Sequence, residues 1–556
     1  MVKTQVSRRG FVTTGAATLV TGAAVAASPA LAADSSAAAD GGVWDEEYDV
    51  VIVGAGGAGY CAAIEAAQTD PDAKIRLFEK MDLVGGSSVM NGGNIGAIGT
   101  DVQAEAGKDD PFFADDTTDL YFEDKMASGD YQADPDLVRI FVDSALDGYE
   151  WLKGLGVTWD KMGVYEAPAY LPSDPSVASL QGSSRYLQVY DEDGCYKGVN
   201  HKGRWIRGAA YKDEKKGAAI MAALEDCVAD TCPNVEVVTG VAMKSIVREG
   251  IVTGDVTGIV VDENGVEKRV RARRAVILTC GGYAANPDLV HLSNMKVDLS
   301  VKPSGGTGNT GDGLIAAGFV GAQTVNMSSV QITHGCNANS NNLSTATSMP
   351  ANPFNGPATF INLDANGKRF WGEMEGSAQY ADAKLTVLSS KHMVNYWTVG
   401  DAASVAAAGA TDEDLATFAD GLGHVCNSVE ELAVVIGCDA TTLQETLDTY
   451  NGFVDAGIDT DFGKATHYLT QHIEQPPFYA FETCYCCRST PGGLRVNADA
   501  SVLDLNGEPI PRLYAAGEVT GSVHGYYRNT GGDSWTECVC FGRIAGANAV
   551  SQQPLA

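Results

Sequence analysis

Near its start the chain places a glycine-rich turn between an apolar run and an alanine-rich stretch, "YDVVIVGAGGAGYCAAIEAAQ". Residues 50–53 are predicted to form a buried strand, and residues 60–68 a helix with an apolar face. The GxGxxG pattern that begins at Gly54 allows a tight turn and lets backbone amides meet a pyrophosphate at the helix N-terminus. A second predicted strand ends in Glu79, whose carboxylate can accept ribose hydroxyls. This order of elements predicts an α/β, Rossmann-like, dinucleotide-binding domain.

A second glycine-rich segment, "GGSSVMNGGNIGA" at 85–97, indicates which dinucleotide binds. It holds too much glycine for an ordinary helix or strand, and we interpret it as backbone laid against a flat ligand. A NAD-type dehydrogenase has no use for such a segment at this point, whereas a flavoprotein uses it to line the isoalloxazine ring. We therefore predict FAD as the cofactor. The residues predicted to bind FAD are Gly54, Gly56, Ala58, Gly59, Glu79, Lys80, Gly86, Ser87, Ser88, Gly92, Gly93, Val241, Gly281, Gly282, Asp312, Gly313, Glu518 and Ser534.

The glycine pattern changes along the chain and predicts the domain organisation. From about residue 326 glycine turns become sparse and predicted helices alternate with loops, until "YAAGEVTG" and "FGRIAG" return to strand, glycine loop and helix. We predict an FAD-binding domain in two parts, 47–325 and 487–556. An α+β capping domain, 326–486, is predicted to be inserted between them.

The N-terminus, "MVKTQVSRRGFVTTGAATLVTGAAVAASPALA", has a twin arginine, a run of small residues and a terminal Ala-Leu-Ala. We predict a twin-arginine signal peptide at 1–32 and an acidic linker at 33–46. The run is too weakly apolar to span a bilayer, so no membrane insertion of the mature chain is expected. The twin-arginine route carries folded proteins and suits a protein that acquires its cofactor first. The predicted location is periplasmic or otherwise extracytoplasmic, with association with the cell surface left open.

The charge of the chain limits its partners. The formal net charge is -33, which disfavours nucleic acid and anionic lipid and favours basic partners. The chain has no C-x-x-C-H haem attachment sequence and no further nucleotide-binding pattern, so reducing equivalents must come from elsewhere. We predict an extracytoplasmic multihaem c-type cytochrome as electron donor, because a basic cytochrome surface would complement the acidic chain.

Several motifs together are specific for one family: "GAGGAG", "TCGGYAAN", "TGDG", "GKRF", "TPGG", "YAAGEVTG" and "FGRIAG". Through them the chain resembles the fumarate reductase/succinate dehydrogenase flavoprotein family, with urocanate reductase and the 3-ketosteroid dehydrogenases as relatives. The resemblance implies a glutathione-reductase-type FAD domain under a clamp domain that covers the flavin. It also implies hydride transfer between the flavin and an activated carbon–carbon bond, which requires groups that polarise the substrate and an acid that protonates it.

The chain departs from the fumarate reductase pattern at the positions that handle fumarate. The family's catalytic arginine lies eight residues beyond the arginine of "GKRF", where this chain has Ser377. Arg488 takes the place of the histidine before "TMGG", and Thr333 stands where the family has the histidine of "QxHP", with His334 one residue later. The glutamate and arginine that relay protons upstream of "GKRF" are also absent. These changes argue against fumarate as the substrate.

The remaining carboxylate-binding position of the family survives as Arg528 in "HGYYRNTGGDSW". Tyr527 and Gly531 have the spacing of the tyrosine and backbone amide that polarise a ketone in 3-ketosteroid dehydrogenases. Glu373 and Tyr380 are further candidate acids. The combination resembles the exported, cysteine-rich cardiac glycoside reductases of gut bacteria. The predicted catalytic residues are Arg528, Tyr527, Arg488, Tyr380, His334 and Gly531.

The stretch "ETCYCCRSTPGG" at 482–493 concentrates three of the chain's thirteen cysteines. They lack both zinc spacing and the C-x-x-C runs of a ferredoxin. A [4Fe-4S] cluster assembled with a second cysteine pair stays open as an alternative to the favoured interpretation, a substrate wall of soft, small thiols. The candidate cluster ligands are Cys484, Cys486, Cys487, Cys538 and Cys540.

These observations predict an exported FAD-dependent reductase that transfers hydride to an α,β-unsaturated carbon–carbon bond of a small organic substrate. A fumarate-like or urocanate-like reductase of a monocarboxylate is the alternative among enzymes, because Arg488 and Arg528 together could hold one carboxylate. A flavin-loaded electron carrier that has lost catalysis is the alternative from another class. The sequence leaves open the exact substrate, the proton donor, the direction of turnover and the oligomeric state.

Overall fold

The computed structural model describes residues 43–162, 204–250, 252–338, 353–354, 357–373, 378–464, 466–526 and 532–556. For residues 333–337 and 378–383 it describes the backbone. The predicted signal peptide and most of the linker after it lie outside the described residues. So do Ser377, Tyr527, Arg528 and Gly531.

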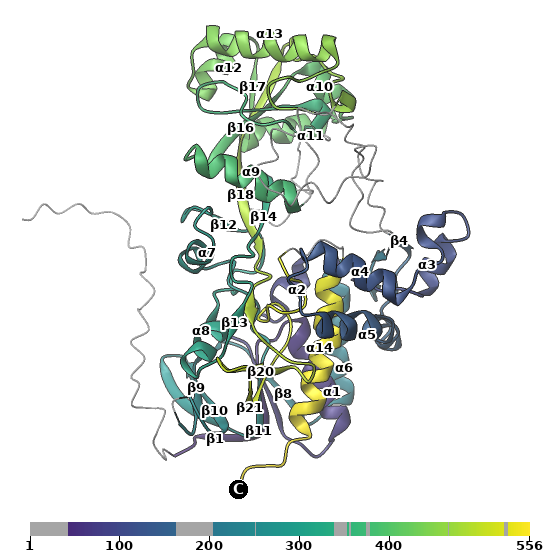
Figure 1. The fold of residues 1–556 in the computed structure, drawn as a ribbon, viewed down its shortest axis with the longest axis vertical. Coiled ribbons are helices and arrows are strands. Elements are labelled where there is room, and N and C mark those ends of the chain that lie inside the picture. Colours follow the sequence, from purple (N-terminus) through teal and green to yellow (C-terminus); the bar gives the residue numbers. More distant parts are fainter. Residues whose placement is uncertain are drawn as a thin grey trace, which may run out of the picture. The chain divides into compact units, whose positions relative to one another are not determined.

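An eight-stranded sheet forms the centre of the nucleotide-binding part (Figure 1). Five strands run parallel in the order β21-β11-β1-β2-β8, and β9, β10 and β20 join antiparallel. The strands are β1 (Glu46–Val53), β2 (Ile75–Phe78), β8 (Val235–Val238), β9 (Val241–Arg248), β10 (Val256–Glu263), β11 (Val266–Leu278), β20 (Ser501–Leu503) and β21 (Pro509–Ala515). Strand β1 is an interior strand of the parallel sheet, and its apolar residues Val50–Val53 are all buried, so both of its faces are covered, as the sequence predicts.

Helices α1 (Gly57–Thr69) and α14 (Asp533–Val550) pack against each other beside this sheet, although they come from opposite ends of the chain. Small residues set how closely they approach. A Cβ atom at Gly542 would lie 2.7 Å from the carbonyl oxygen of Ala58, and one at Gly546 would lie 2.3 Å from that of Ala62. These two glycines, one helical turn apart, let the backbones meet directly, with the middle of α14 against the first half of α1.

The remaining helices and strands of this part lie between the strands named above in the sequence. The helices are α2 (Gly86–Met90), α3 (Asp101–Ala106), α4 (Thr118–Ser128), α5 (Pro135–Gly154), α6 (Lys216–Thr231), α7 (Pro287–Ser293) and α8 (Asp312–Phe319). The strands are β3 (Ile95–Gly96), β4 (Lys161–Met162), β5 (Trp205–Arg207), β6 (Ala210–Tyr211), β7 (Glu214–Lys215), β13 (Thr324–Val325) and β19 (Gly493–Leu494). Within the described ranges, no helix has the length and apolar character needed to cross a membrane.

A second sheet, largely antiparallel, lies mostly in the predicted capping domain; β12 and the last residues of β18 fall outside the predicted bounds of 326–486. Its strands are β12 (Lys302–Pro303), β14 (Gln331–Asn337), β15 (Ile361–Leu363), β16 (Asn395–Gly400), β17 (His424–Cys426) and β18 (Phe478–Ser489). The accompanying helices are α9 (Ala378–Ser390), α10 (Ala402–Ala407), α11 (Asp412–Thr417), α12 (Val429–Ile436) and α13 (Ala440–Ala456). These elements enclose a hydrophobic core of their own, which includes Leu432, Leu443 and Tyr450.

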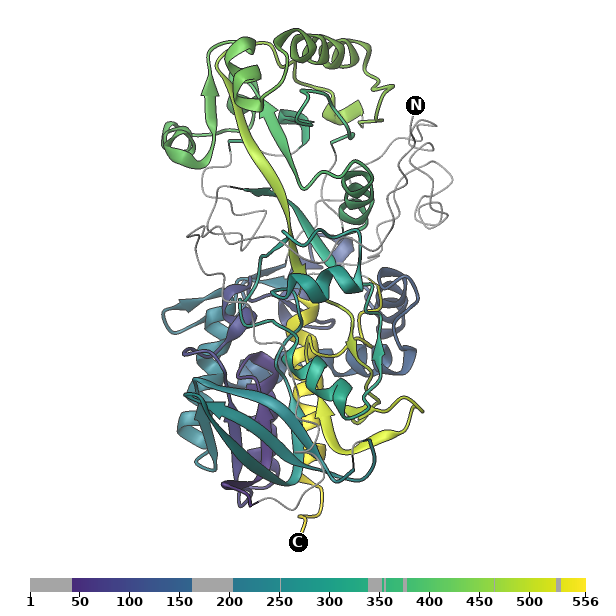
Figure 2. The ribbon, with the colours of Figure 1, turned by 90° about the vertical axis from the view of Figure 1, so that its left-hand side faces the viewer.

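Strand β18 joins the two parts of the molecule and appears as the long yellow-green strand of Figure 2. Its first half pairs with β16 and β17, and its second half pairs with β14 and β12. The predicted domain boundary between residues 486 and 487 therefore falls inside one continuous strand. The mixed α/β architecture with a parallel nucleotide-binding sheet confirms the predicted fold class.

Candidate active site

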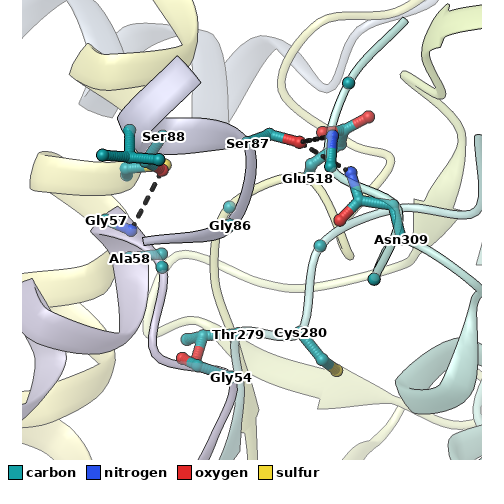
Figure 3. Close-up of a pocket in the computed structure, with 18 of the residues that line it drawn as sticks. Gly54, Gly57, Ala58, Gly86, Ser87, Ser88, Thr279, Cys280, Asn309 and Glu518 are labelled. Atoms are coloured by element: carbon teal, nitrogen blue, oxygen red, sulfur yellow. Dashed lines mark hydrogen bonds between the residues drawn. The ribbon is translucent and has the colours of Figure 1, made fainter. Parts of the chain in front are cut away.

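A cavity of about 450 Å³ lies where the chain leaves β1, β2 and β11 and enters α1 and α14 (Figure 3). Crevices at the carboxyl ends of parallel strands are the usual ligand sites of open α/β sheets. Most of the residues predicted to bind FAD line this cavity. They are Gly54, Gly56, Ala58, Glu79, Lys80, Gly86, Ser87, Ser88, Gly92, Val241, Gly281, Asp312, Glu518 and Ser534.

Four predicted glycines, Gly59, Gly93, Gly282 and Gly313, stand behind the cavity wall instead. A Cβ atom at any of them would come within 2.0–2.2 Å of a neighbouring atom; at Gly59 that atom is the carbonyl oxygen of Gly54. No real Cβ atom tolerates such a contact. The absence of a side chain at these glycines therefore lets the segments of the wall pack closely against each other, and does not make room for a ligand.

The first turn of α1 has the form of a pyrophosphate cradle. Gly56 caps the helix without a side-chain hydrogen bond, and the Gly57 amide donates to Ser88 Oγ at 3.0 Å (Figure 3). A Cβ atom at Gly56 would meet nothing closer than 3.8 Å, and one at Gly86 would meet nothing within 4 Å. The cavity thus reaches the bare backbone at both glycines, where amides and the helix dipole favour a phosphate group.

Glu79 is 9 % exposed and holds the glycine turn. Its Oε2 accepts a hydrogen bond from the Ala55 amide at 3.0 Å, and its Oε1 accepts from the Met81 amide at 2.9 Å. An ionised carboxylate has about four lone-pair sites, so two hydrogen bonds leave capacity for ribose hydroxyls. Next to it, Lys80 Nζ pairs with Asp312 Oδ2 at 2.5 Å and neutralises that side of the cavity.

The glycine-rich segment 85–97 is tied to two other walls. Ser87 Oγ accepts from the Gly306 amide at 2.9 Å and from Asn309 Nδ2 at 3.0 Å. Trp535, in the first turn of α14, donates from Nε1 to Asn91 Oδ1 at 2.8 Å. Contrary to the expectation from its glycine content, the segment contains the short helix α2 and the two-residue strand β3. The bonds hold it as a fixed surface, which fits the predicted role against a flat ring.

Sequence reasoning missed several residues that line the cavity, among them Thr279, Asn309, Trp535 and Glu537. Thr279 is the first residue of "TCGGYAAN", two positions before the glycine pair, and its Oγ1 donates to the carbonyl oxygen of Gly54 at 2.8 Å. Asn309 lies within "GGTGNTGDG". The same glycine-rich segments that identified their neighbours could have identified these two, whereas nothing local in the sequence singles out Trp535 or Glu537.

Of the predicted catalytic residues, the structure places Arg488 on the cavity wall. It is the exposed residue near the end of β18, between the buried residues Cys487 and Ser489. The backbone places Tyr380 in the first turn of α9, and His334 on β14 opposite Tyr485. The predicted contributions of Tyr527, Arg528 and Gly531 lie outside the described residues.

The cysteines of β18 lie on alternating sides of the strand. Cys484 and Cys486 share one side, with their Sγ atoms 4.0 Å apart, while Cys487 packs in the main hydrophobic core. Burial raises the pKa of Cys540 to about 12. In the part of the chain that the structure describes, no group of three or more His, Cys, Asp or Glu side chains could hold a metal ion. This geometry gives no support to the alternative of a [4Fe-4S] cluster.

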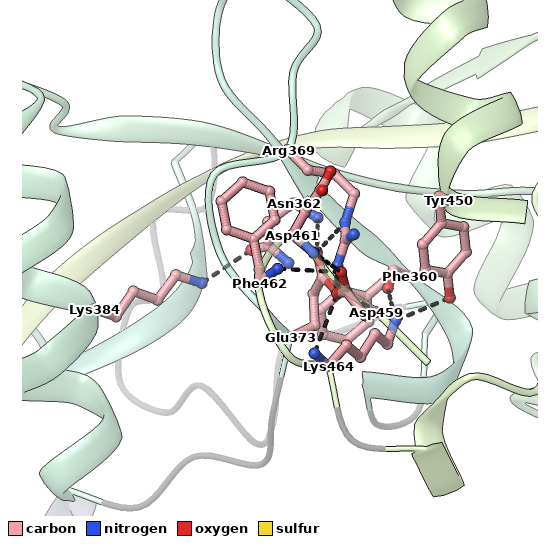
Figure 4. A network of polar contacts seen from close by, with 10 residues as sticks. All are labelled: Phe360, Asn362, Arg369, Glu373, Lys384, Tyr450, Asp459, Asp461, Phe462 and Lys464. Atoms are coloured by element: carbon pink, nitrogen blue, oxygen red, sulfur yellow. Dashed lines mark hydrogen bonds and ion pairs between the residues drawn. The ribbon is translucent and has the colours of Figure 1, made fainter. Parts of the chain in front are cut away.

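Glu373, a candidate acid, belongs to a buried ionic network of the capping domain (Figure 4). Arg369 Nη2 contacts Glu373 Oε2 at 2.9 Å and Asp459 Oδ2 at 2.8 Å, and Lys464 Nζ lies 3.5 Å from Glu373 Oε2. Burial alone would raise the pKa of Glu373, but the two cations hold it below its ordinary value. A carboxylate held ionised and away from the cavity is suited to a structural role and not to protonating a substrate.

The fold and the cavity define a flavoprotein: a glycine cradle at a helix N-terminus, an acidic residue at the ribose position and a glycine-lined surface for a flat ring. The family model described as "FAD binding domain" matches residues 49–533. The chain belongs to this FAD-binding family, binds FAD and is an FAD-dependent oxidoreductase.

Curated relatives extend over nearly the whole chain. It is 30 % identical over 514 residues to a probable fumarate reductase of Shewanella frigidimarina, covering 91 % of this chain and 75 % of the relative. It is 28 % identical to a urocanate reductase of Eggerthella lenta, covering 91 % of this chain and 75 % of that enzyme. A digoxin reductase, also of Eggerthella lenta, is 26 % identical and covered to 95 %, with 98 % of this chain aligned.

Solved structures agree with the fold. The open conformation of a flavocytochrome c3 fumarate reductase matches with a TM-score of 0.70 and 27 % identity, over 91 % of this chain and 78 % of the other. A 3-ketosteroid-Δ4-(5α)-dehydrogenase of Rhodococcus jostii matches with a TM-score of 0.63 and 24 % identity, over 92 % and 98 % of the two chains. The predicted fold class and the predicted resemblance are both confirmed.

Proposed function

We propose that the protein is an ene-reductase that saturates an activated, α,β-unsaturated carbon–carbon bond of a small organic substrate other than fumarate. FAD supplies the hydride when bound. Relatives named for the reduction of fumarate, urocanate and digoxin support the reaction type, since each of those substrates carries a carbon–carbon double bond conjugated to an electron-withdrawing group. The choice of substrate rests on the residues of this chain.

The position of Arg488, an exposed residue that lines the cavity, is the observation that carries this proposal. Among the described residues that line the cavity, the cationic side chains are Lys80 and Arg488, and Lys80 directly follows Glu79 at the ribose position. A guanidinium at the wall can bind a carbonyl oxygen or one carboxylate and draw electron density from the double bond. We assign this polarising role to Arg488.

The capping domain supplies the position of Arg488 through β18. The strand is anchored in the capping core at Phe478 and Ala480 and reaches the cavity at its last two residues. Buried neighbours on both sides fix the backbone of Arg488, so the strand delivers one cation to the cavity at a defined place. We propose Tyr527, Arg528 and the Gly531 amide as its partners, on the strength of the family resemblance.

Two further parts of the proposal concern the setting of the reaction. We propose export by the twin-arginine route, because the twin arginine and the Ala-Leu-Ala motif stand at the spacing of such a signal. We propose a c-type cytochrome as electron donor, supported by the acidic charge of the chain and by the match to a flavocytochrome. Reduction of a monocarboxylate is the second candidate, favoured by the same guanidinium.

Anaerobic reoxidation tests the proposal. The FAD-loaded protein is reduced with a viologen and mixed in turn with fumarate, urocanate, a cinnamate-type acid, a neutral enone and an unsaturated lactone, while the flavin absorbance is followed. Reoxidation by a neutral or monocarboxylate alkene and not by fumarate is the expected result. Fast reoxidation by fumarate would contradict the substrate assignment. Reoxidation by a cytochrome alone, with no alkene active, would instead support an electron carrier.

A further inference from the structure

A buried ionic chain backs the wall of the FAD cavity at the start of α14. Lys125, from α4, and Asp533, at the first position of α14, have fully buried side chains, with Nζ and Oδ2 2.8 Å apart. Lys125 Nζ also lies 3.0 Å from His524 Nδ1. His524 Nε2 in turn lies 2.9 Å from Glu537 Oε2, and Glu537 lines the cavity.

The direction of each hydrogen bond in this chain follows from the chemistry of its members. A lysine ammonium group can only donate, so His524 Nδ1 accepts from Lys125. The ring proton must then be on Nε2, which donates to Glu537 Oε2. Burial, and then the charge of Lys125, lower the pKa of His524, which keeps the ring neutral. The chain therefore runs from a fixed cation through a neutral imidazole to a carboxyl group on the cavity wall.

Burying these charges is costly, and the surrounding residues show that the arrangement is specific. Asp533 Oδ1 accepts from the Tyr121 hydroxyl at 3.3 Å, and Lys125 Nζ lies 4.8 Å from the centre of the Phe141 ring. The next charged residue, Arg204, stacks on the Tyr121 ring at 4.7 Å and is itself paired with Asp116 and Asp124. Since a buried ion pair gives little net stability compared with an apolar pair, stability alone does not account for this cluster.

We propose that Lys125 is a positioning residue of the flavin site: it balances the charge of Asp533 at the first turn of α14 and, through His524, sets the orientation of the Glu537 carboxyl group in the cavity wall. Both carboxyl groups belong to the helix whose N-terminal residues line the cavity, and they stand one helical turn apart. Reduction adds negative charge to the flavin. A cation fixed behind this wall therefore favours the reduced cofactor, and a carboxylate without its cation opposes it.

The test is the midpoint potential of FAD in the full-length holoprotein, measured by equilibration with redox dyes. Lys125→Met is expected to lower the potential and Asp533→Asn to raise it. The double variant, which removes both charges, is expected to return close to the wild-type potential. If Lys125 and Asp533 had only a structural role, the two substitutions would change the stability of the protein without shifting the FAD potential in opposite directions. Should Lys125→Met fail to fold, Asp533→Asn and the double variant still decide the sign.

A matched control comes from Lys464 in the capping domain, a fully buried lysine 3.5 Å from Glu373 and outside the cavity. Lys464→Met is expected to lower stability and leave the potential unchanged. Shifts of the same sign in both Lys125→Met and Asp533→Asn, or an equal shift in Lys464→Met, would overturn the proposal.

The ¹⁵N chemical shifts of His524 in the holoprotein give a second readout that does not depend on turnover. The expected wild-type spectrum has Nε2 protonated and Nδ1 bare at neutral pH, and Lys125→Met is expected to change the Nδ1 shift. A wild-type proton on Nδ1 would contradict the donor order on which the inference rests. The inference concerns the FAD site and holds whichever alkene the enzyme reduces.

Discussion

Gly56 and Gly59 belong to one motif, but changing each to alanine is expected to affect a different property: FAD binding at Gly56 and the stability of the protein at Gly59. At Gly59 the new Cβ atom would lie 2.0 Å from the Gly54 carbonyl oxygen and 2.9 Å from Thr279 Oγ1. Ordinary contacts begin near 3.4 Å, so α1 must move away from the end of β1 by roughly 1 Å or more. Overpacking of this kind costs about 1–3 kcal/mol or more.

At Gly56 the nearest atom to the new Cβ would be Ser88 Oγ at 3.8 Å, and the backbone is extended, with φ at -87°. Alanine therefore fits the protein, and the loss of the glycine cap costs less than about 1 kcal/mol. The methyl group would instead occupy space beside the phosphate cradle. A clash of about 1–3 kcal/mol with the cofactor corresponds to roughly 5-fold to 150-fold weaker FAD binding.

The assay compares two quantities for each variant: the urea midpoint of the apoprotein and the FAD affinity from quenching of flavin fluorescence. Gly56→Ala is expected to keep the wild-type urea midpoint and to bind FAD more weakly. Gly59→Ala is expected to show mainly a lower urea midpoint. Gly452→Ala, in helix α13 of the capping domain, is the control, because a Cβ atom there would meet nothing within 4 Å and its backbone has no positive φ. If Gly56→Ala bound FAD as tightly as the wild type, the cradle would be misassigned.

Buried and exposed cations give three more predictions. Burial lowers the pKa of Lys384 to about 7, against about 10.4 in an unfolded chain. Between these two pH values the unfolded state binds more protons than the folded state. The free energy of unfolding therefore rises with pH, by at most about 1.4 kcal/mol per pH unit. When urea midpoints are measured from pH 7 to 9, Lys384→Met should lose this rise with pH, while Lys391→Met, at an exposed lysine, should keep it. Equal slopes in the two variants would refute the lowered pKa of Lys384. Arg369→Met should lower stability by about 3–5 kcal/mol, because it takes a shared cation from two buried carboxylates, with FAD still bound; an unchanged midpoint would contradict this. Arg488→Gln should lower kcat/KM for the active alkene by roughly 10-fold to 100-fold, the value of a charge-assisted hydrogen bond, at unchanged FAD content, and an unaltered kcat/KM would remove Arg488 from the site.

The nucleotide-binding half of the molecule could be predicted from the sequence because its determinants are local. A buried strand, a glycine turn and a helix N-terminus lie within about twenty consecutive residues, and glycine is needed there for steric reasons that no other residue meets. The parallel sheet and the cavity at its carboxyl edge result from that order. The change of pattern near residue 326 likewise indicated a second domain, although β18 runs without a break through its predicted end.

Only the tertiary structure decided which residues far apart in the chain contact each other. Gly59 and Gly56 belong to one motif, yet one packs against backbone and the other faces the cavity. Glu373 is a candidate acid by residue type, but Lys464, which is far from it in the sequence, lies 3.5 Å from its carboxylate and joins the nearby Arg369 in holding it ionised. Lys125 and Asp533 are separated by 408 positions, and neither has a local signal of its role. The sequence by itself determined the cofactor, because backbone shape recognises FAD locally; charge states and pairings depend on burial, which exists only once distant segments pack together.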